Sequence, residues 1–102
     1  MSKDKRIEFH NILKSIMGSD NVYYQPPSKL IYPCIIYDKN DHLVQYGNDK
    51  KYINRTQYTI TLIGKVTDND KIIDKIMDLD YCTFDRRYIS DNLYHDVFTI
   101  YY

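Results

Sequence analysis

The sequence predicts an α+β domain in which two helices pack on one face of a mainly antiparallel sheet. Segments 3–17 and 72–79 carry apolar residues at helical three-to-four spacing. Segment 55–64 alternates apolar and polar side chains, and other segments are rich in β-branched and aromatic residues, as strands are. The resulting order is α-β-β-β-α-β-β, and runs of strands interrupted by helices are typical of α+β folds.

The length and charge of the chain restrict its class. A chain of 102 residues makes one domain, spanning 1–102. Its 14 basic and 14 acidic residues cancel, so no global field attracts nucleic acid or an acidic membrane. No stretch reaches transmembrane length, and the charged N-terminus lacks the apolar run of a signal peptide, which predicts a soluble protein. Cys34 and Cys82 are expected to be buried reduced thiols, with one disulfide as the alternative.

The first half of the chain is expected to form one helix and two strands. Helix 3–17 should bury a stripe made of Phe9, Ile12, Leu13 and Ile16. A short strand over 22–24 should end at Pro26 and Pro27, because proline cannot donate to a strand ladder. Segment 34–37 is a continuous apolar run, which is typical of a central strand that is buried on both faces.

The segment 38–54 is polar and longer than most connections in a compact domain. We expect it to form a long loop or arm between the second and third strands, with a short edge strand around 43–46. Long connections of this kind are usually functional or disordered. The arm is therefore a candidate contact surface, and the alternative is a solvated hairpin without a role.

The second half is expected to form a strand, a helix and a hairpin. Polar residues over 67–70 predict an N-cap for the second helix. The hairpin occupies 81–102 and turns at 90–92. Simple alternation places Phe84 and Tyr88 on one face of its first strand. The second strand should end the sequence as a paired strand inside the sheet, because an unpaired terminus frays.

The sequence predicts no catalytic, cofactor-binding or metal-binding residue. His95 and Asp96 are neighbours in a strand and must point to opposite faces, so they cannot form a dyad. The three histidines are scattered, and no zinc-ligand spacing occurs. The carboxylates of Asp85, Asp91 and Asp96 could bind Mg²⁺ as a group, although aspartates near turns more often cap backbone amides. A metal-dependent enzyme using Asp85 and Asp96 remains the alternative from another class.

Basic and aromatic residues are interleaved at two places, around 50–55 and 86–88, as in proteins that bind single strands. Because each cluster lies beside an acidic residue in a neutral chain, ion pairing within the fold or between subunits is the preferred interpretation. No sequence-specific nucleic-acid binding is predicted. The candidate subunit or partner interface consists of Tyr46, Lys50, Lys51, Tyr52, Arg55, Arg86, Arg87, Tyr101 and Tyr102.

Several phrases of the sequence, taken in order and spacing, resemble a family of small structural proteins from tailed bacteriophages. These proteins are known as tail terminator, tail completion or minor capsid proteins. The phrases are NVYYQPP (21–27), YPCIIY (32–37), KKY (50–52), YTITLI (58–63), LDYCTFDRRY (79–88) and NLYHDVFTIYY (92–102). They cover nearly all of the chain beyond the first helix.

The resemblance implies an α+β subunit that assembles without catalysis or a cofactor. Such subunits would form a homo-oligomeric ring, expected to be a hexamer, which caps the head-proximal end of the tail tube. The implied partners are the tail tube protein and the head–tail connector, and genome DNA would pass through the ring. The protein would be made in the bacterial cytoplasm and reside in the virion. A connector, neck or minor capsid protein of the same virion is the alternative.

Overall fold

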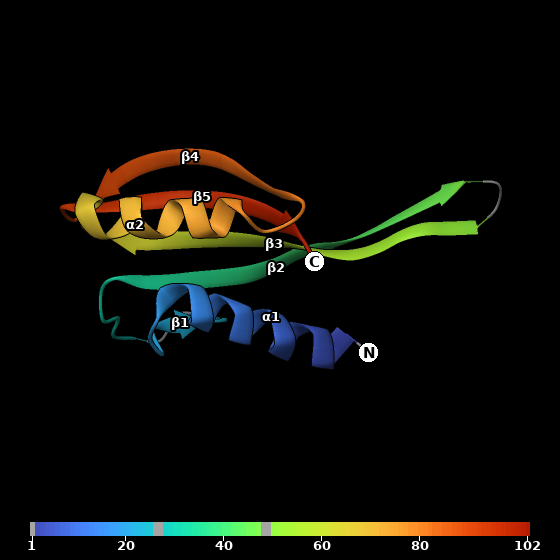
Figure 1. Ribbon diagram of the computed structural model, residues 1–102, viewed down its shortest axis with the longest axis horizontal. Coiled ribbons are helices and arrows are strands. Elements are labelled where there is room, and N and C mark those ends of the chain that lie inside the picture. Colours follow the sequence, from blue (N-terminus) through green and yellow to red (C-terminus); the bar gives the residue numbers. More distant parts are fainter. Residues whose placement is uncertain (1, 26–27, 48–49) are drawn as a thin grey trace.

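The computed structural model describes the backbone of residues 2–25, 28–47 and 50–102, and the side chains of 5–25, 28–40 and 55–102. Within these residues, two helices and five strands are present, and the strands form one sheet (Figure 1). The elements are α1 (Ser2–Met17), β1 (Val22–Tyr23), β2 (Cys34–Gly47), β3 (Lys50–Gly64), α2 (Val66–Met77), β4 (Cys82–Ser90) and β5 (Leu93–Tyr101). The predicted α+β class and element order are confirmed.

The sheet has the strand order β1-β2-β3-β5-β4. Every neighbouring pair is antiparallel except β1 and β2, which run parallel, so the sheet is mixed rather than purely antiparallel. The last strand of the sequence, β5, lies between β3 and β4, and Tyr102 N–H continues the pairing by donating to Thr56 O at 2.9 Å. The prediction that this segment is paired inside the sheet is therefore confirmed.

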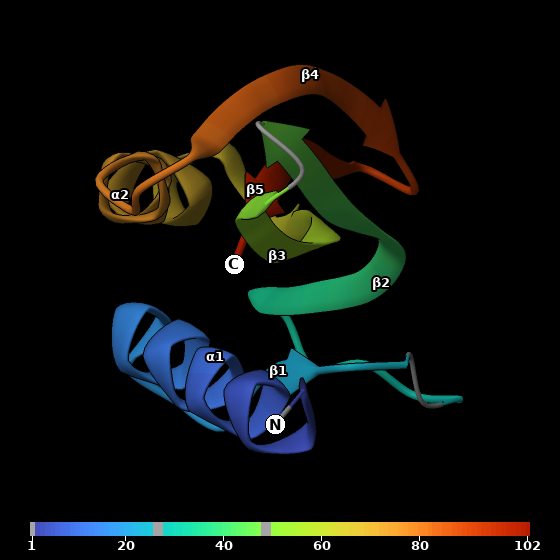
Figure 2. The ribbon, with the colours of Figure 1, turned by 90° about the vertical axis from the view of Figure 1, so that its right-hand side faces the viewer.

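Both helices cover the same face of the sheet, as predicted (Figure 2). The register aligns Tyr37 with Ile60 and Ile60 with Phe98, so one row of side chains crosses β2, β3 and β5 beneath the helices. Burial of these apolar surfaces is the main force holding the two layers together. The buried cluster consists of Phe9, Leu13, Val22, Ile35, Tyr37, Tyr58, Ile60, Leu62, Ile72, Ile76, Phe98 and Ile100.

An aromatic cluster attaches α1 to the sheet. The Phe9 ring is fully buried and lies edge-on to Tyr37, with centroids 5.5 Å apart. The same ring stacks on Tyr58 at 4.7 Å and contacts Tyr102 at 5.0 Å. Such pairs stabilise a fold beyond the area that they bury. Part of the tyrosine excess therefore serves the core, and the hydroxyls of Tyr37 and Tyr102 reach polar partners on α1.

The start of α2 differs from the prediction. The helix begins at Val66, and its N-cap is Lys65, which makes no side-chain capping bond. The polar residues 67–70 therefore lie inside the first turns rather than before them. Asn69 is fully buried and its amide donates to Tyr94 O at 3.0 Å and Asp96 Oδ2 at 2.9 Å. A long-range polar network thus uses a side chain that local rules assign to a cap.

The hairpin of β4 and β5 contains a bulge that the alternation rule missed. Asp91 and Asn92 have φ values of 54° and 65°, as a two-residue hairpin turn requires. The register shifts between Phe84 and Arg86. The extra residue at this bulge changes the face of everything that follows it on the strand. The prediction that Phe84 and Tyr88 share a face was therefore wrong: Phe84 pairs with Phe98 under the helices, whereas Tyr88 pairs with His95 on the other face.

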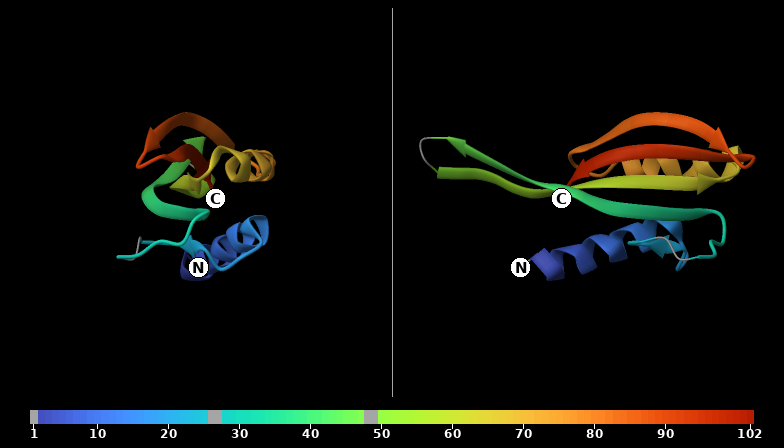
Figure 3. Two further views of the ribbon diagram at one scale, coloured as in Figure 1. Left: turned by 90° about the vertical axis from the view of Figure 1, so that its left-hand side faces the viewer. Right: turned by 180° about the vertical axis from the view of Figure 1, so that it is seen from behind.

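The arm is a two-stranded ribbon rather than a loop. β2 and β3 pair with each other along their lengths, from Cys34 and Ile63 to Gly47 and Lys50. Among the described strands, β1 pairs with β2 only at 35–36, and β5 pairs with β3 only at 57–64. The distal parts of β2 and β3 therefore extend beyond the body (Figures 1 and 3). The molecule measures 49 × 24 × 21 Å as a result. Hydrogen bonds between the two strands satisfy backbone N–H and C=O groups of this polar segment, so it can form strands without a hydrophobic core beneath it.

The two thiols are free. Cys34 is buried and Cys82 is half-buried. Burial raises the pKa of each thiol to about 11, with the charge of Asp85 adding to the effect at Cys82. Both thiols are therefore protonated and weakly nucleophilic near neutral pH.

Candidate interaction surfaces

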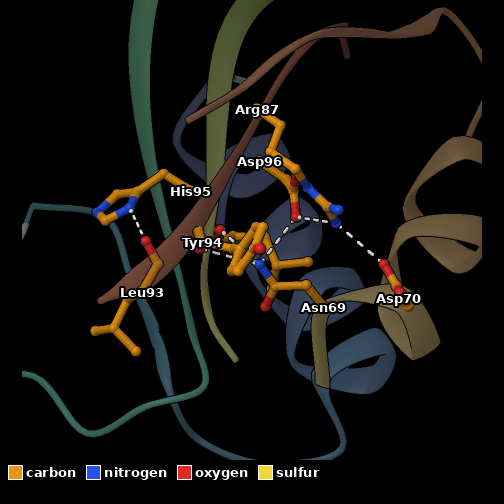
Figure 4. Close-up of polar contacts among 8 residues, drawn as sticks. Asn69, Asp70, Arg87, Leu93, Tyr94, His95 and Asp96 are labelled. Atoms are coloured by element: carbon orange, nitrogen blue, oxygen red, sulfur yellow. Dashed lines mark hydrogen bonds and ion pairs between the residues drawn. The ribbon is translucent and has the colours of Figure 1, made fainter. Parts of the chain in front are cut away.

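A polar network joins α2 to the C-terminal hairpin (Figure 4). Asp96 is fully buried, and Arg87 donates to it from Nε at 2.5 Å and from a terminal nitrogen at 3.1 Å. The same terminal nitrogen donates to Asp70 on α2 at 3.0 Å. Asn69 donates to the second oxygen of Asp96. Three elements are therefore tied together through one carboxylate.

This network is built to hold the fold. Hydrogen bonds to Asp96 and Asp70 raise the pKa of Arg87 further above its ordinary range, so the guanidinium stays charged. The guanidinium also lies over the Tyr94 ring, 5.0 Å from its centroid. Asn69 Oδ1 is buried without a hydrogen-bond partner, and a Cβ at Gly64 would come within 2.8 Å of it. A side chain at residue 64 would therefore displace Asn69 and disturb the network.

The aspartates considered as metal ligands do not converge. Asp85 accepts a hydrogen bond from Thr99 Oγ1 at 2.5 Å, and Thr99 points to the opposite face of β5 from Asp96. Within the described part of the chain, no group of three or more His, Cys, Asp or Glu side chains could hold a metal ion.

A groove of about 430 Å³ between α1 and α2 is open to solvent and mainly apolar, and its lining includes Ile16 and Leu79.

Several of the candidate interface residues make contacts within the fold. Arg55 lies over the Tyr81 ring at 4.3 Å, and Gln57 donates to the Tyr101 hydroxyl at 3.1 Å. Tyr102 packs against Phe9 and donates to Glu8. Arg87 belongs to the network described above, whereas Arg86 is exposed and contacts the ring of Tyr88 at 5.7 Å.

The remaining candidates lie on the arm. Tyr46 is in β2, and Lys50, Lys51 and Tyr52 are in β3. The register pairs Tyr46 with Lys51 across the ribbon. Their side chains are outside the described residues, so only their backbone positions are assigned. The structure brings these four residues together near the distal end of the arm, far along the sequence and in space from the hairpin candidates (Figure 1).

Sequence reasoning missed the free edge of the sheet at β4. Among the described strands, β4 pairs only with β5, and residues 83–90 are all exposed. Three large apolar side chains lie on this strand, with Phe84 43%, Tyr88 42% and Ile89 61% exposed. The mixture of apolar and charged residues in this segment is compatible with an edge strand. It does not reveal the order of strands in the sheet, which is what leaves β4 at the edge.

A titratable cluster lies where α1 meets β2. His10 Nδ1 is 2.7 Å from the Tyr37 hydroxyl, and Arg6 donates to the same hydroxyl at 3.4 Å. Burial lowers the pKa of His10, and the charges of Lys14 and Arg6 lower it further. Burial likewise raises the pKa of Tyr37. The folded protein therefore favours neutral forms of both groups.

This cluster predicts a pH dependence of stability. Because folding lowers the pKa of His10 below its ordinary value of 6.5, the unfolded chain binds a proton more readily than the folded protein. The free energy of unfolding should therefore fall as the pH drops through about 6.5 towards the folded pKa. Urea unfolding from pH 7.5 to 5.5 measures this slope. The slope should flatten in His10→Gln, and an unchanged slope in that variant would contradict the prediction.

Comparison with protein-family models, with curated proteins and with solved structures finds no match to this chain. Neither α1 nor α2, the two helices of the described residues, is long and apolar enough to cross a membrane. The fold therefore defines the class of the protein as a small α+β domain with a projecting β-ribbon, and the surfaces must supply the functional argument.

Proposed function

We propose that the protein is a tail terminator of a tailed bacteriophage. In this role, copies of the chain form a ring, a hexamer, that closes the head-proximal end of the tail tube and joins it to the head connector. The ring acts by protein contact without catalysis or a cofactor, and it leaves a channel for genome DNA. The protein is made in the host cytoplasm and resides at the tail or neck of the virion.

The observation that carries this proposal is the arm. Within the described residues, no further strand lies beside the distal parts of β2 and β3 and no helix lies over them (Figures 1 and 3). A ribbon that projects from its own core leaves backbone donors and acceptors at both edges. These groups can extend the sheet of a neighbouring molecule. A projecting ribbon suits a subunit that must reach its neighbours in a closed assembly.

The resemblance of the sequence to phage tail proteins supplies the particular assembly. The buried surfaces add support, because the polar network of Asp96 and the core around Phe9 are occupied by the fold itself. Outward-facing groups at the arm and the sheet edge are then the surfaces left for partners. A ring requires contacts that differ on the two sides of each subunit, and the arm lies at one end of the body only (Figure 3).

We expect substitutions in the arm to impair assembly while leaving folding intact. Lys50→Glu with Lys51→Glu should change the free energy of unfolding by less than about 0.5 kcal/mol, because surface substitutions away from packed sites rarely do more. The same variant should fail to form rings or completed tails, since it replaces the two positive charges near the distal end of the ribbon with negative ones. Light scattering and negative-stain microscopy of the variant with isolated tail tubes measure these outcomes.

A matched control is Lys65→Glu with Lys71→Glu. Both of these lysines are exposed, and they lie at the opposite end of the body from the arm. The control makes the same change in net charge and should assemble normally. Normal tails with the arm variant would rule out the arm as a contact. Binding of the wild-type protein to isolated connectors but never to tubes would instead identify a connector or neck protein.

A further inference from the structure

The edge of the sheet at β4 has the properties of a pairing surface. Among the described strands, β4 has a partner on one side only, and exposed Phe84, Tyr88 and Ile89 border its free edge. A long edge strand with exposed apolar side chains is a template for another strand. The chain also places charges of both signs at the middle of this strand, at Asp85, Arg86 and Arg87.

The hydrogen bonding of the hairpin determines which backbone groups point outward. Tyr101 N–H donates to Tyr81 O at 3.2 Å, so Tyr81 and Thr83 turn their groups towards β5, whereas Cys82 and Phe84 turn theirs away. At the other end, Ser90 is the residue that closes the two-residue turn and faces β5.

Alternation back along the strand from Ser90 identifies the other residues whose backbone N–H and C=O groups point away from β5. The backbone groups of Ile89 and Arg87 turn outward, like those of Cys82 and Phe84. The bulge between Phe84 and Arg86 makes the change from even to odd positions possible. The free edge therefore offers two pairs of outward residues, one pair on each side of the bulge.

This edge is complementary to itself. A second strand placed antiparallel about the bond between residues 85 and 86 sets Cys82 opposite Ile89 and Phe84 opposite Arg87. All four of these residues have outward backbone groups. The register with β5 also places their side chains on the helix-covered face, so each opposing pair shares a face.

The remaining residues of the strand match on the other face. Thr83 falls opposite Tyr88, and Asp85 falls opposite Arg86, so carboxylate and guanidinium meet twice across the two-fold axis. Both side chains are exposed: Asp85 accepts from Thr99 at 2.5 Å through one carboxylate oxygen, and the Arg86 guanidinium lies over the Tyr88 ring, 5.7 Å from its centroid. Neither residue forms an ion pair in the described part of the molecule, so their charges can pair with a partner strand.

We propose that two copies of this chain pair through β4 in this antiparallel register, with Asp85 of each copy opposite Arg86 of the other. The contact joins two sheets into one and covers Phe84, Tyr88 and Ile89. It is isologous, so it closes at two copies and cannot build a ring. The proposal therefore goes beyond the terminator ring and does not depend on it.

Charge exchange tests this pairing. In Arg86→Asp, two carboxylates would oppose each other on each side of the axis, and the dimer dissociation constant should rise by at least about tenfold, since like charges directly opposite destabilise paired strands. In Asp85→Arg with Arg86→Asp, opposite charges face each other again, and the dissociation constant should return to within a few-fold of the wild type. Sedimentation equilibrium over a range of concentrations measures all three proteins.

Each outcome decides the proposal. Circular dichroism confirms that the variants fold, as expected for exposed positions, and the double variant controls for composition because it contains the same residues in exchanged order. A wild-type protein that remains monomeric, or self-association that Arg86→Asp leaves unchanged, would overturn the pairing and show that the bulge and charges protect the edge instead. Lys50→Glu with Lys51→Glu should leave the dimer intact, which separates this contact from the ring.

Discussion

Replacing Arg87 by methionine should lower the free energy of unfolding by about 3 kcal/mol. The variant leaves the carboxylate of Asp96 fully buried with only the amide of Asn69 as a side-chain donor. Removing one partner of a buried ion pair typically costs about 3–5 kcal/mol. We expect the lower end because the Arg87 side chain is 31% exposed, so water can partly replace it. Urea unfolding followed by circular dichroism at neutral pH measures the loss.

The adjacent arginine provides a matched control. Arg86→Met makes the same chemical change one residue earlier on β4, where the side chain is exposed and forms no ion pair in the described part of the chain. It should change the free energy of unfolding by less than about 0.5 kcal/mol. Combining Arg87→Met with Asp96→Leu should recover part of the loss, because the buried charge is then gone. Equal losses for Arg86→Met and Arg87→Met would show that the network does not stabilise the fold.

Phe9→Ala should cost about 3–5 kcal/mol, the range for removing a fully buried aromatic ring. The variant removes the ring that contacts Tyr37, Tyr58 and Tyr102 and leaves a cavity between α1 and the sheet. The loss should appear as a lower urea midpoint with an unchanged slope against denaturant concentration, because the same surface is exposed on unfolding.

Ile7→Ala is the control for the same helix. Ile7 is 45% exposed and lies two residues from Phe9, on another side of α1. It should lower the free energy of unfolding by less than about 1 kcal/mol, because less apolar surface returns to water. Similar losses for the two variants would mean that α1 does not attach to the sheet through Phe9.

Much of the fold was predictable from local patterns. The stripe of α1 and the alternation of Tyr58, Ile60 and Leu62 predict their elements because one face of each must be buried and the other solvated. The order of elements then restricts the architecture to helices on one side of a sheet. These signals are strong where a single buried face decides which residues occur.

The features that local patterns missed depend on contacts between distant residues. Asn69 resembles a cap residue, but its amide serves three acceptors, among them Asp96 on another strand. A bulge at Asp85 cannot be distinguished from regular alternation by composition, although it reverses the face of Tyr88. The sequence of the arm is polar and shows no regular alternation, so its two strands follow from their pairing with each other.

The candidate surfaces were predictable only in part. The arm is recognisable in the sequence as a long polar segment. The free edge at β4 follows from the order of strands in the sheet, and the residue pattern of one strand contains no information about that order. Arg86 and Arg87 look alike in the sequence. The bulge and the neighbouring strand direct one into the network with Asp96 and leave the other at the surface.

The position of β5 has a consequence for the order in which the sheet can form. This strand follows all the others in the sequence, yet it lies between β3 and β4 in the sheet. Before β5 emerges from the ribosome, β3 and β4 lack the strand that lies between them. The edge of β3 that contains Ile60 and Leu62 is then unpaired. The sheet therefore cannot be completed before β5 has been synthesised, and until then the nascent chain carries unpaired strand edges that can pair with other nascent chains.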